Sequence, residues 1–231
     1  MIHFFALPLP EPPVAYRETD HTREKKAHTR QRLLSAARDI VAAEGFAAAT
    51  AAAVAARSGV AAGTIYRHFP SKPELVAEVF RYATEHEVAQ VAAATTQGNS
   101  VAERLTHAVQ VFAGRALRGP MLAYALIAEP VDPRVEQERL AHRLAYADIF
   151  EDLITEGMQA GEFVAQDATV SAAALVGLLA EALVGPLCQQ QTDSGRRQPL
   201  PDAAQQQLIH ALTALCLRAL GAPASTGVMH A

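Results

Sequence analysis

The chain has 231 residues, of which 50% are hydrophobic and 19% charged, so it can bury a sizeable core in one large or two small domains. The net charge of −4 is too small to indicate a nucleic-acid or acidic partner from the overall balance. The distribution says more, because residues 17–81 hold 11 Lys/Arg against 7 Asp/Glu, whereas residues 82–231 hold 9 against 16. This asymmetry predicts a basic head that faces nucleic acid and an acidic body.

The sequence carries no signal for secretion, a disulfide framework or a membrane span. Cys188 and Cys216 lack CxxC or histidine spacing, which argues against a zinc site and is typical of a reducing compartment such as the cytoplasm. The N-terminus is interrupted by four prolines and has no charged segment or cleavage site. The most apolar stretch, residues 168–188, contains Glu181 and only nine uninterrupted apolar residues, short of the ~20 that a span needs. We expect it to be a buried or interface helix.

Helix signals cover most of the chain, and strand signals are nearly absent, which predicts an all-α fold with about nine helices. The first is expected over residues 29–44, where apolar residues recur at i, i+4 and i+7 before Gly45. Thr50 is a good N-cap for a short helix to residue 57, and residues 63–69 are expected to form another after a turn at Gly59. Residues 71–74 (SKPE) form a capping box that begins a longer helix.

Four further N-caps divide the second half of the chain. The caps are Ser100, Asp132, Asp167 and Asp202. The helices that they begin are expected to end at Gly119, near Gly161, around Gly185 and before Gly221, with one short apolar helix running from the first of these ends to Glu129. Residues 189–201 are expected to be a flexible loop.

Residues 50–69 have the pattern of a helix-turn-helix unit, which places its second helix in a major groove ~12 Å wide. Val54 and Ala55 on the first helix are spaced to face Ile65 and Phe69 on the second. The outer side then holds Gly63, Thr64, Arg67 and His68, with Tyr66 and Lys72 at its flanks.

Residues 63–75 (GTIYRHFPSKPEL) resemble the TetR (tetracycline-repressor) family of bacterial transcriptional regulators. The resemblance covers residues 30–76 and includes Ala36-Ala37, Gly45-Phe46, Thr50, Val54-Ala55 and Gly59-Val60. It implies a homodimer that reads the two half-sites of a near-palindromic operator. It also implies a helical C-terminal domain that binds an effector and releases the DNA. The later residues resemble the family only in the number and order of their helices.

The resemblance also implies roles for single residues. Thr50, Tyr66, His68 and Lys72 match positions that touch phosphate, and Gly63, Thr64 and Arg67 match positions near base edges. His68 has the alternative of packing beside Phe69. The chain departs from the family at Ala61-Ala62, where an N-cap hydroxyl and a donor are lost, so base readout is expected mainly from Thr64 and Arg67.

A basic stretch lies before or inside the first helix and has two interpretations. It consists of Arg23, Lys25, Lys26, Arg30 and Arg32. It is either a solvated helix start or an arm that contacts phosphates or the minor groove.

Aromatic residues and a methionine in the middle helices are candidates for the wall of an effector cavity, with core packing as the alternative. They are Phe112, Met121, Tyr124, Tyr146 and Phe150. Because few charges are expected to converge there, the predicted effector is a small hydrophobic molecule.

One face of the eighth helix carries Ala173, Gly177, Glu181 and Gly185 at intervals of four residues. Glycine inside a helix costs ~1 kcal/mol relative to alanine, so this face predicts close backbone approach. Pairing it and the last helix, which adds Leu212 and Leu215, with their copies would form a two-fold four-helix bundle. Packing within one chain is the alternative.

The predicted organisation is a flexible tail (1–21), a DNA-binding domain (22–71), an effector-binding and dimerisation domain (72–221) and a second tail (222–231). The predicted function is a cytoplasmic, ligand-responsive repressor. A helical dimeric interaction protein without sequence-specific DNA binding is the alternative, supported only by Ala61-Ala62. The chain lacks HExxH, GxSxG and Gly-rich phosphate loops, so no enzymatic activity, metal site or cofactor is predicted.

Overall fold

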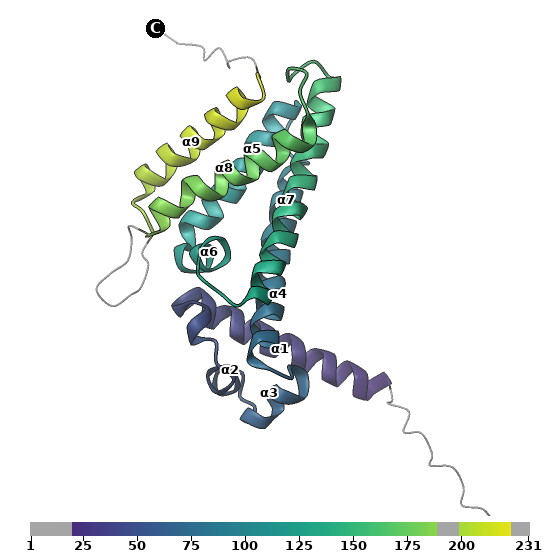
Figure 1. Cartoon of the computed structure of the whole chain (residues 1–231), viewed down its shortest axis with the longest axis vertical. Helices are drawn as coiled ribbons and strands as arrows, with labels where there is room; N and C mark the ends of the chain where they lie inside the picture. The colour runs from purple at the N-terminus through teal and green to yellow at the C-terminus, as the bar shows by residue number, and fades with distance from the viewer. Residues whose placement is uncertain (1–19, 189–198, 223–231) are drawn as a thin grey trace, which may run out of the picture.

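The computed structural model describes residues 20–188 and 199–222. These residues form nine α-helices and one short 3-10 helix, without a strand, so the predicted all-α fold is confirmed for them (Figure 1). The elements are α1 (Asp20–Glu44), η1 (Phe46–Ala48), α2 (Ala51–Ser58), α3 (Ala62–His68), α4 (Lys72–Ala94), α5 (Val101–Arg118), α6 (Pro120–Ile127), α7 (Pro133–Gln159), α8 (Ala168–Cys188) and α9 (Asp202–Ala219). Most of the predicted tails and loop lies outside the described residues.

Side-chain caps begin most of the helices where the sequence predicts them. Thr50 accepts from the N–H of Ala53 at 3.1 Å, and Ser71 accepts from the N–H of Glu74 at 3.3 Å. Ser100, Asp132 and Asp167 act in the same way at α5, α7 and α8. These bonds satisfy donors that the first turn of a helix leaves without a partner.

Three helix boundaries show the clearest differences from the sequence pattern. α1 begins at Asp20 rather than near residue 29, so it includes two residues that the pattern assigns to the tail. Residues 20–28 are all exposed, so no apolar face marks them as part of a helix. Residues 23–27 (REKKA) nevertheless have high helix propensity. α8 continues through Pro186 to Cys188, because a proline in the last turn removes few helical hydrogen bonds. Asp202 is the first residue of α9 and does not cap it.

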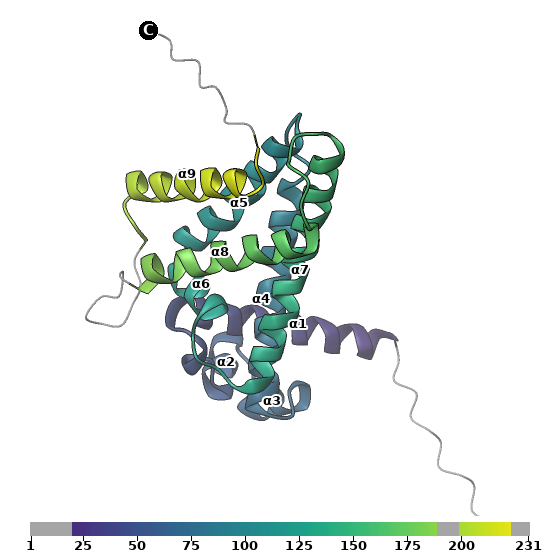
Figure 2. The same cartoon turned by 45° about the horizontal axis from the view of Figure 1, so that its top comes forward.

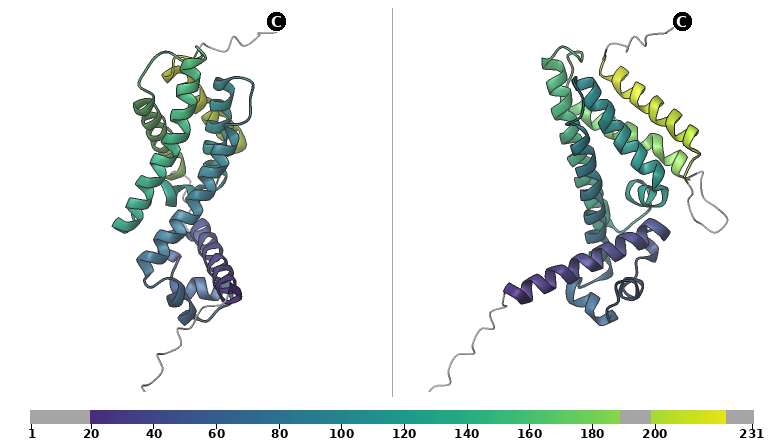
Figure 3. Two further views of the ribbon diagram at one scale, coloured as in Figure 1. Left: turned by 90° about the vertical axis from the view of Figure 1, so that its right-hand side faces the viewer. Right: turned by 180° about the vertical axis from the view of Figure 1, so that it is seen from behind.

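The head consists of α1, η1, α2 and α3, and the body consists of α5 to α9. α4 runs from the head into the body beside α7 (Figures 1 and 3). Its first half, from Leu75 to Ala83, packs in the core of the head, and Val91 belongs to the core of the body. One helix therefore contributes side chains to both cores.

The head core also includes residues from two body helices. Leu122 and Ala125 of α6 and Val135 of α7 are buried there. The predicted division at residue 72 therefore stays a prediction, since packing joins the two parts on both sides of it.

α8 and α9 lie on one side of the body (Figure 2). Among the described helices, α8 is the one long and apolar enough to cross a membrane by length and composition, and the mean hydropathy of an 18-residue stretch within it is 1.9. Its buried face, including Leu175, Leu179 and Leu183, belongs to the body core. A core helix of this composition satisfies the same criterion.

Candidate DNA-binding head and effector cavity

The second helix of the predicted helix-turn-helix unit is α3, and its inner face packs as the sequence predicts. Ile65 and Phe69 are each 1% exposed and share a core with Val54 and Ala55 of α2. Gly59 ends α2 in the left-handed region, at φ 69°, which glycine adopts without strain. The turn therefore fixes the angle at which α3 leaves α2.

The outer face of α3 is open to solvent. Gly63, Tyr66 and Arg67 are exposed, and Thr64 and His68 are half-buried. Lys72 and Thr50 are exposed at the first turns of α4 and α2. The seven predicted DNA contacts thus surround one helix, and their roles stay predictions. Ala61 makes no side-chain capping bond, in agreement with the expected loss of the hydroxyl.

His68 packs beside the recognition face without a hydrogen bond to its Nδ1 atom, which is buried. Its ring centroid lies 6.4 Å from that of Phe69. Partial burial lowers the pKa of His68, and the positive charges of Lys26, Arg30 and Arg67 lower it further. The imidazole is therefore held in its neutral form near neutral pH.

Two arginines of the basic stretch have partners on other helices. Arg30 pairs with Glu78 at 2.8 Å and lies over the ring of Phe69, 5.1 Å from its centroid. Arg32 donates to the carbonyl of Ser58 at 2.9 Å. These contacts favour a structural interpretation of both arginines over a free arm.

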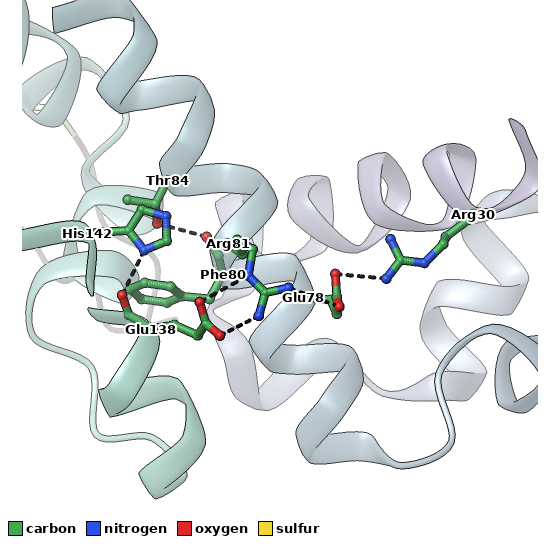
Figure 4. Close-up of polar contacts among 7 residues, drawn as sticks. All are labelled: Arg30, Glu78, Phe80, Arg81, Thr84, Glu138 and His142. Carbon is green, nitrogen blue, oxygen red and sulfur yellow. Dashed lines mark hydrogen bonds and ion pairs between the residues drawn. The ribbon is translucent and has the colours of Figure 1, made fainter. Parts of the chain in front are cut away.

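A chain of ion pairs crosses from the head to the body (Figure 4). Glu78 of α4 bridges Arg30 of α1 and Arg81 of α4, and Arg81 also pairs with Glu138 of α7 through two hydrogen bonds. Burial raises the pKa of Glu78, but Arg30 and Arg81 together hold it below its ordinary value. These ion pairs thus tie α1, α4 and α7 together through charge-assisted hydrogen bonds.

A cavity of about 320 Å³ lies where the head meets the body, within the size range of small-molecule sites. Its lining comes from α1 and from α4 to α8. It comprises Arg38, Phe80, Thr84, Glu87, Val91, Phe112, Arg115, Ala116, Arg118, Gly119, Leu122, Ala123, Leu126, Ile127, Arg139, His142, Arg143, Tyr146, Val176 and Ala180. Among the described residues, no group of three or more His, Cys, Asp or Glu is arranged to hold a metal.

Two of the five predicted effector contacts line this cavity. Phe112 and Tyr146 meet edge to face, with ring centroids 5.2 Å apart. Met121, Tyr124 and Phe150 are not part of the lining. Phe150 is fully buried in the body core one helical turn beyond Tyr146, further from the head. Sequence spacing predicted which side of α7 faces the cavity, but not how far along α7 the cavity extends.

The expectation that few charges converge on the cavity is wrong. Five arginines and Glu87 belong to its lining. The arginines come from α1, α5 and α7, which are distant in sequence, so no local pattern brings them together. Phe80, Thr84 and His142, also in the lining, were likewise missed, because their shared location depends on the packing of α4 against α7 (Figure 4).

Three groups in the cavity wall are fixed by their neighbours. Arg115 forms a bidentate pair with Glu87, with nitrogen to oxygen distances of 2.5 and 2.9 Å. His142 directs Nδ1 at the carbonyl of Glu138, 2.7 Å away, so this nitrogen carries the proton. Burial raises the pKa of Tyr146, and its hydroxyl stays neutral.

The predicted dimer face of α8 is exposed in the single chain. Ala173, Gly177, Glu181 and Gly185 are all exposed. A Cβ added at either glycine would meet no atom within 4 Å. Packing within the chain therefore does not explain these glycines, and the interface role stays a prediction.

Of the two α9 residues predicted at the interface, only Leu215 is available. It is 40% exposed, whereas Leu212 is 3% exposed and belongs to the body core. The assignment of Leu212 to the interface is therefore corrected. Both residues are apolar and three apart, and only the packing of α9 on α5 decides which one turns inward.

Comparison with known proteins matches both parts of the chain. Residues 33–79 match the bacterial regulatory proteins of the tetR family, and residues 98–183 match the tetracyclin repressor-like C-terminal domain. The first range contains α2 with its N-cap Thr50, α3 and the beginning of α4, and so includes all seven predicted DNA contacts.

Two curated relatives share part of the sequence. The HTH-type transcriptional repressor KstR of Mycolicibacterium smegmatis is 32% identical over 109 residues, which are 47% of this chain and 53% of KstR. The nucleoid occlusion factor SlmA of Vibrio vulnificus is 28% identical over 133 residues, 57% of this chain and 66% of SlmA. The chain thus spans about half to two thirds of the length of these relatives.

A solved structure shares the fold over most of its length. The transcriptional regulator FadR from Bacillus subtilis, in complex with stearoyl-CoA, has a TM-score of 0.63 and 19% identity, and the match covers 80% of this chain and 97% of FadR. At this identity, the likeness shows the fold alone. With both the N-terminal and the C-terminal domain matched, the chain belongs to the TetR family of bacterial transcriptional regulators.

Proposed function

We propose that the protein is a cytoplasmic, ligand-responsive repressor that binds operator DNA as a homodimer and is released by an effector in the cavity. The observation that carries the proposal is the exposed outer face of α3, whose inner residues Ile65 and Phe69 are buried against α2, in a segment that matches the tetR family. KstR is named a transcriptional repressor, and FadR was solved with an acyl-CoA, which supports both halves of the proposal.

The layout supplies a physical route from effector to DNA. The cavity wall includes Arg38 of α1, a helix of the head, and Phe80 of α4, whose first half packs in the head core. A dimer must engage two half-sites ~34 to 36 Å apart at once, so a small displacement of one head is enough to weaken binding. A preference of ~2.8 kcal/mol for the non-binding arrangement changes operator affinity about a hundredfold.

Fluorescence anisotropy with the DNA upstream of the protein's own gene tests this function. We expect saturable binding to that DNA, at least a hundredfold tighter than to random duplex at the same salt concentration. Equal binding to both, or none, would instead support the alternative of an interaction protein without sequence-specific DNA binding.

The effector role has a reciprocal test. A compound that binds the cavity must lower operator affinity by the same factor by which operator DNA lowers its own affinity. A ligand that stabilises the protein and leaves operator affinity unchanged would show that the cavity is not the regulatory site.

A further inference from the structure

We propose that the cavity selects an anionic amphiphile, a molecule with an apolar body and one carboxylate or phosphate group. The inference deepens the proposed effector role and rests on it. It replaces the purely hydrophobic effector that the sequence predicts, because the charges of the lining come from elements that only the fold brings together.

The lining contains five arginines and one carboxylate. Two of the arginines are already neutralised by the protein. Arg115 is bound by both oxygens of Glu87. Arg139 pairs with Glu136 and donates to the carbonyls of Ala125, Leu126 and Glu129 at 3.3, 3.0 and 2.8 Å. These two residues build the wall and have little capacity left for a ligand.

The guanidinium groups of the other three arginines remain available to bind a ligand. Within residues 20–188 and 199–222, the side chains of Arg118 and Arg143 make no hydrogen bond or ion pair, and both residues are exposed at the cavity. In the described part of the chain, the guanidinium of Arg38 forms an ion pair only with its neighbour Asp39, at 3.6 Å, and Asp39 also lies 3.9 Å from Arg57. Three positive charges are therefore left with weak compensation or none.

A guanidinium binds carboxylate and phosphate through two parallel hydrogen bonds. The same site disfavours a cation by like-charge repulsion and gives a neutral alcohol no ionic contact. The apolar body of the ligand is accommodated by Phe112, Leu122, Ile127 and Val176 in the rest of the wall. An anionic amphiphile matches both features, because its apolar body fits the wall and its anionic group binds the uncompensated arginines.

Arg38 gives the anionic group a direct contact with the head. It lies on α1, and its neighbour Asp39 is the residue close to Arg57 of α2. An anion that binds Arg38 competes with Asp39 for it. The ligand thus contacts a helix of the head directly, and the helices of the body are not needed to connect them.

The test uses four ligands of equal chain length to displace the neutral fluorophore N-phenyl-1-naphthylamine from the full-length protein. They are decanoate, decyl phosphate, decan-1-ol and decyltrimethylammonium. We expect one or both anions to bind at least tenfold more tightly than the alcohol, and the cation to bind most weakly. The two anions distinguish a carboxylate from a phosphate ligand. Equal or tighter binding of the alcohol, or no binding of any of the four, would overturn the proposal.

Variants identify the residues responsible. The double variant Arg118→Gln/Arg143→Gln should lose at least tenfold in affinity for the preferred anion and keep its affinity for decan-1-ol. Arg134→Gln is the matched control, because Arg134 is an exposed arginine of α7 outside the cavity lining. Equal weakening of anion and alcohol in the double variant would show that the arginines only shape the wall. Operator binding without ligand is measured separately, so its failure is distinguishable from a failure here.

Discussion

The carboxylate of Glu129 accepts hydrogen bonds from the backbone N–H of Phe46, with nitrogen to Oε1 and Oε2 distances of 3.1 and 3.2 Å. Glu129 lies between α6 and α7, and Phe46 begins η1 in the head. Arg139, a residue of the cavity wall, donates to the backbone carbonyl of Glu129 at 2.8 Å. One residue therefore connects the cavity wall with the head.

Glu129→Ala should lower the free energy of unfolding by about 1 to 3 kcal/mol, because it leaves the partly buried N–H of Phe46 without its acceptor. Urea denaturation followed by circular dichroism measures the change. Glu129→Gln is the control, since its amide oxygen can still accept the bond, and it should lose less. Equal stability of wild type and the alanine variant would show that this contact contributes nothing.

Lys72→Ala should weaken binding to operator and random DNA by about the same factor. Lys72 is exposed at the first turn of α4, four residues after the end of α3, and a phosphate contact carries no sequence information. The slope of log affinity against log salt should decrease by roughly one per subunit. Anisotropy titrations at several salt concentrations measure this, with Arg134→Ala as a control far from α3 in the sequence. A sequence-selective loss with an unchanged slope contradicts the phosphate role.

Arg67→Ala should relax the preference at one or two base pairs, at roughly 1 to 3 kcal/mol each. Arg67 is exposed on the outer face of α3, where a guanidinium can form two hydrogen bonds with a guanine edge. Competition between the operator and single-base variants measures the preference. If operator and random DNA lose affinity equally, Arg67 does not read bases.

Gly177→Leu should weaken the dimer by roughly 1 to 3 kcal/mol through overpacking. It should leave the isolated chain folded, because a Cβ at this position meets no atom of the chain within 4 Å. Analytical ultracentrifugation measures the dissociation constant, and anisotropy measures the accompanying loss of operator binding. Ala93→Leu, at an exposed position of α4, is the control. A dimer of wild-type affinity in the glycine variant would remove this face from the interface.

His68 should make the protein less stable on acidification. Burial and three neighbouring cations lower its pKa in the folded state, so below the ordinary pKa of about 6.5 the unfolded chain binds a proton that the folded chain does not. The contribution of His68 to the free energy of unfolding is therefore fully present above that value, and it is lost as the pH decreases towards the lowered pKa. His68→Gln, which does not titrate, should lose less stability between pH 7.5 and 5 in urea denaturation. Parallel pH profiles of the two proteins would exclude this effect.

The sequence by itself determined the helices and the recognition unit, because both depend on local chemistry. Thr50, Ser71 and Ser100 cap helices through bonds that span three residues, and Gly59 adopts the left-handed conformation that its turn requires. The periodicity of α2 and α3 correctly placed Val54, Ile65 and the other inner residues in one core. The start of α1 was missed, because a fully exposed segment leaves no apolar pattern.

Only the tertiary structure decided three further features. They are the charge of the cavity, how far the cavity extends along α7, and which side of α9 turns inward. Arg38 and Arg143 are more than a hundred residues apart and line one cavity because α1 and α7 pack beside α4. Phe150 satisfies the same local pattern as Tyr146 but does not line the cavity. Leu212 satisfies the same pattern as the exposed Leu215 but is buried in the core. Local periodicity fixes which side chains share a helix face, whereas burial depends on what the neighbouring helices place against that face.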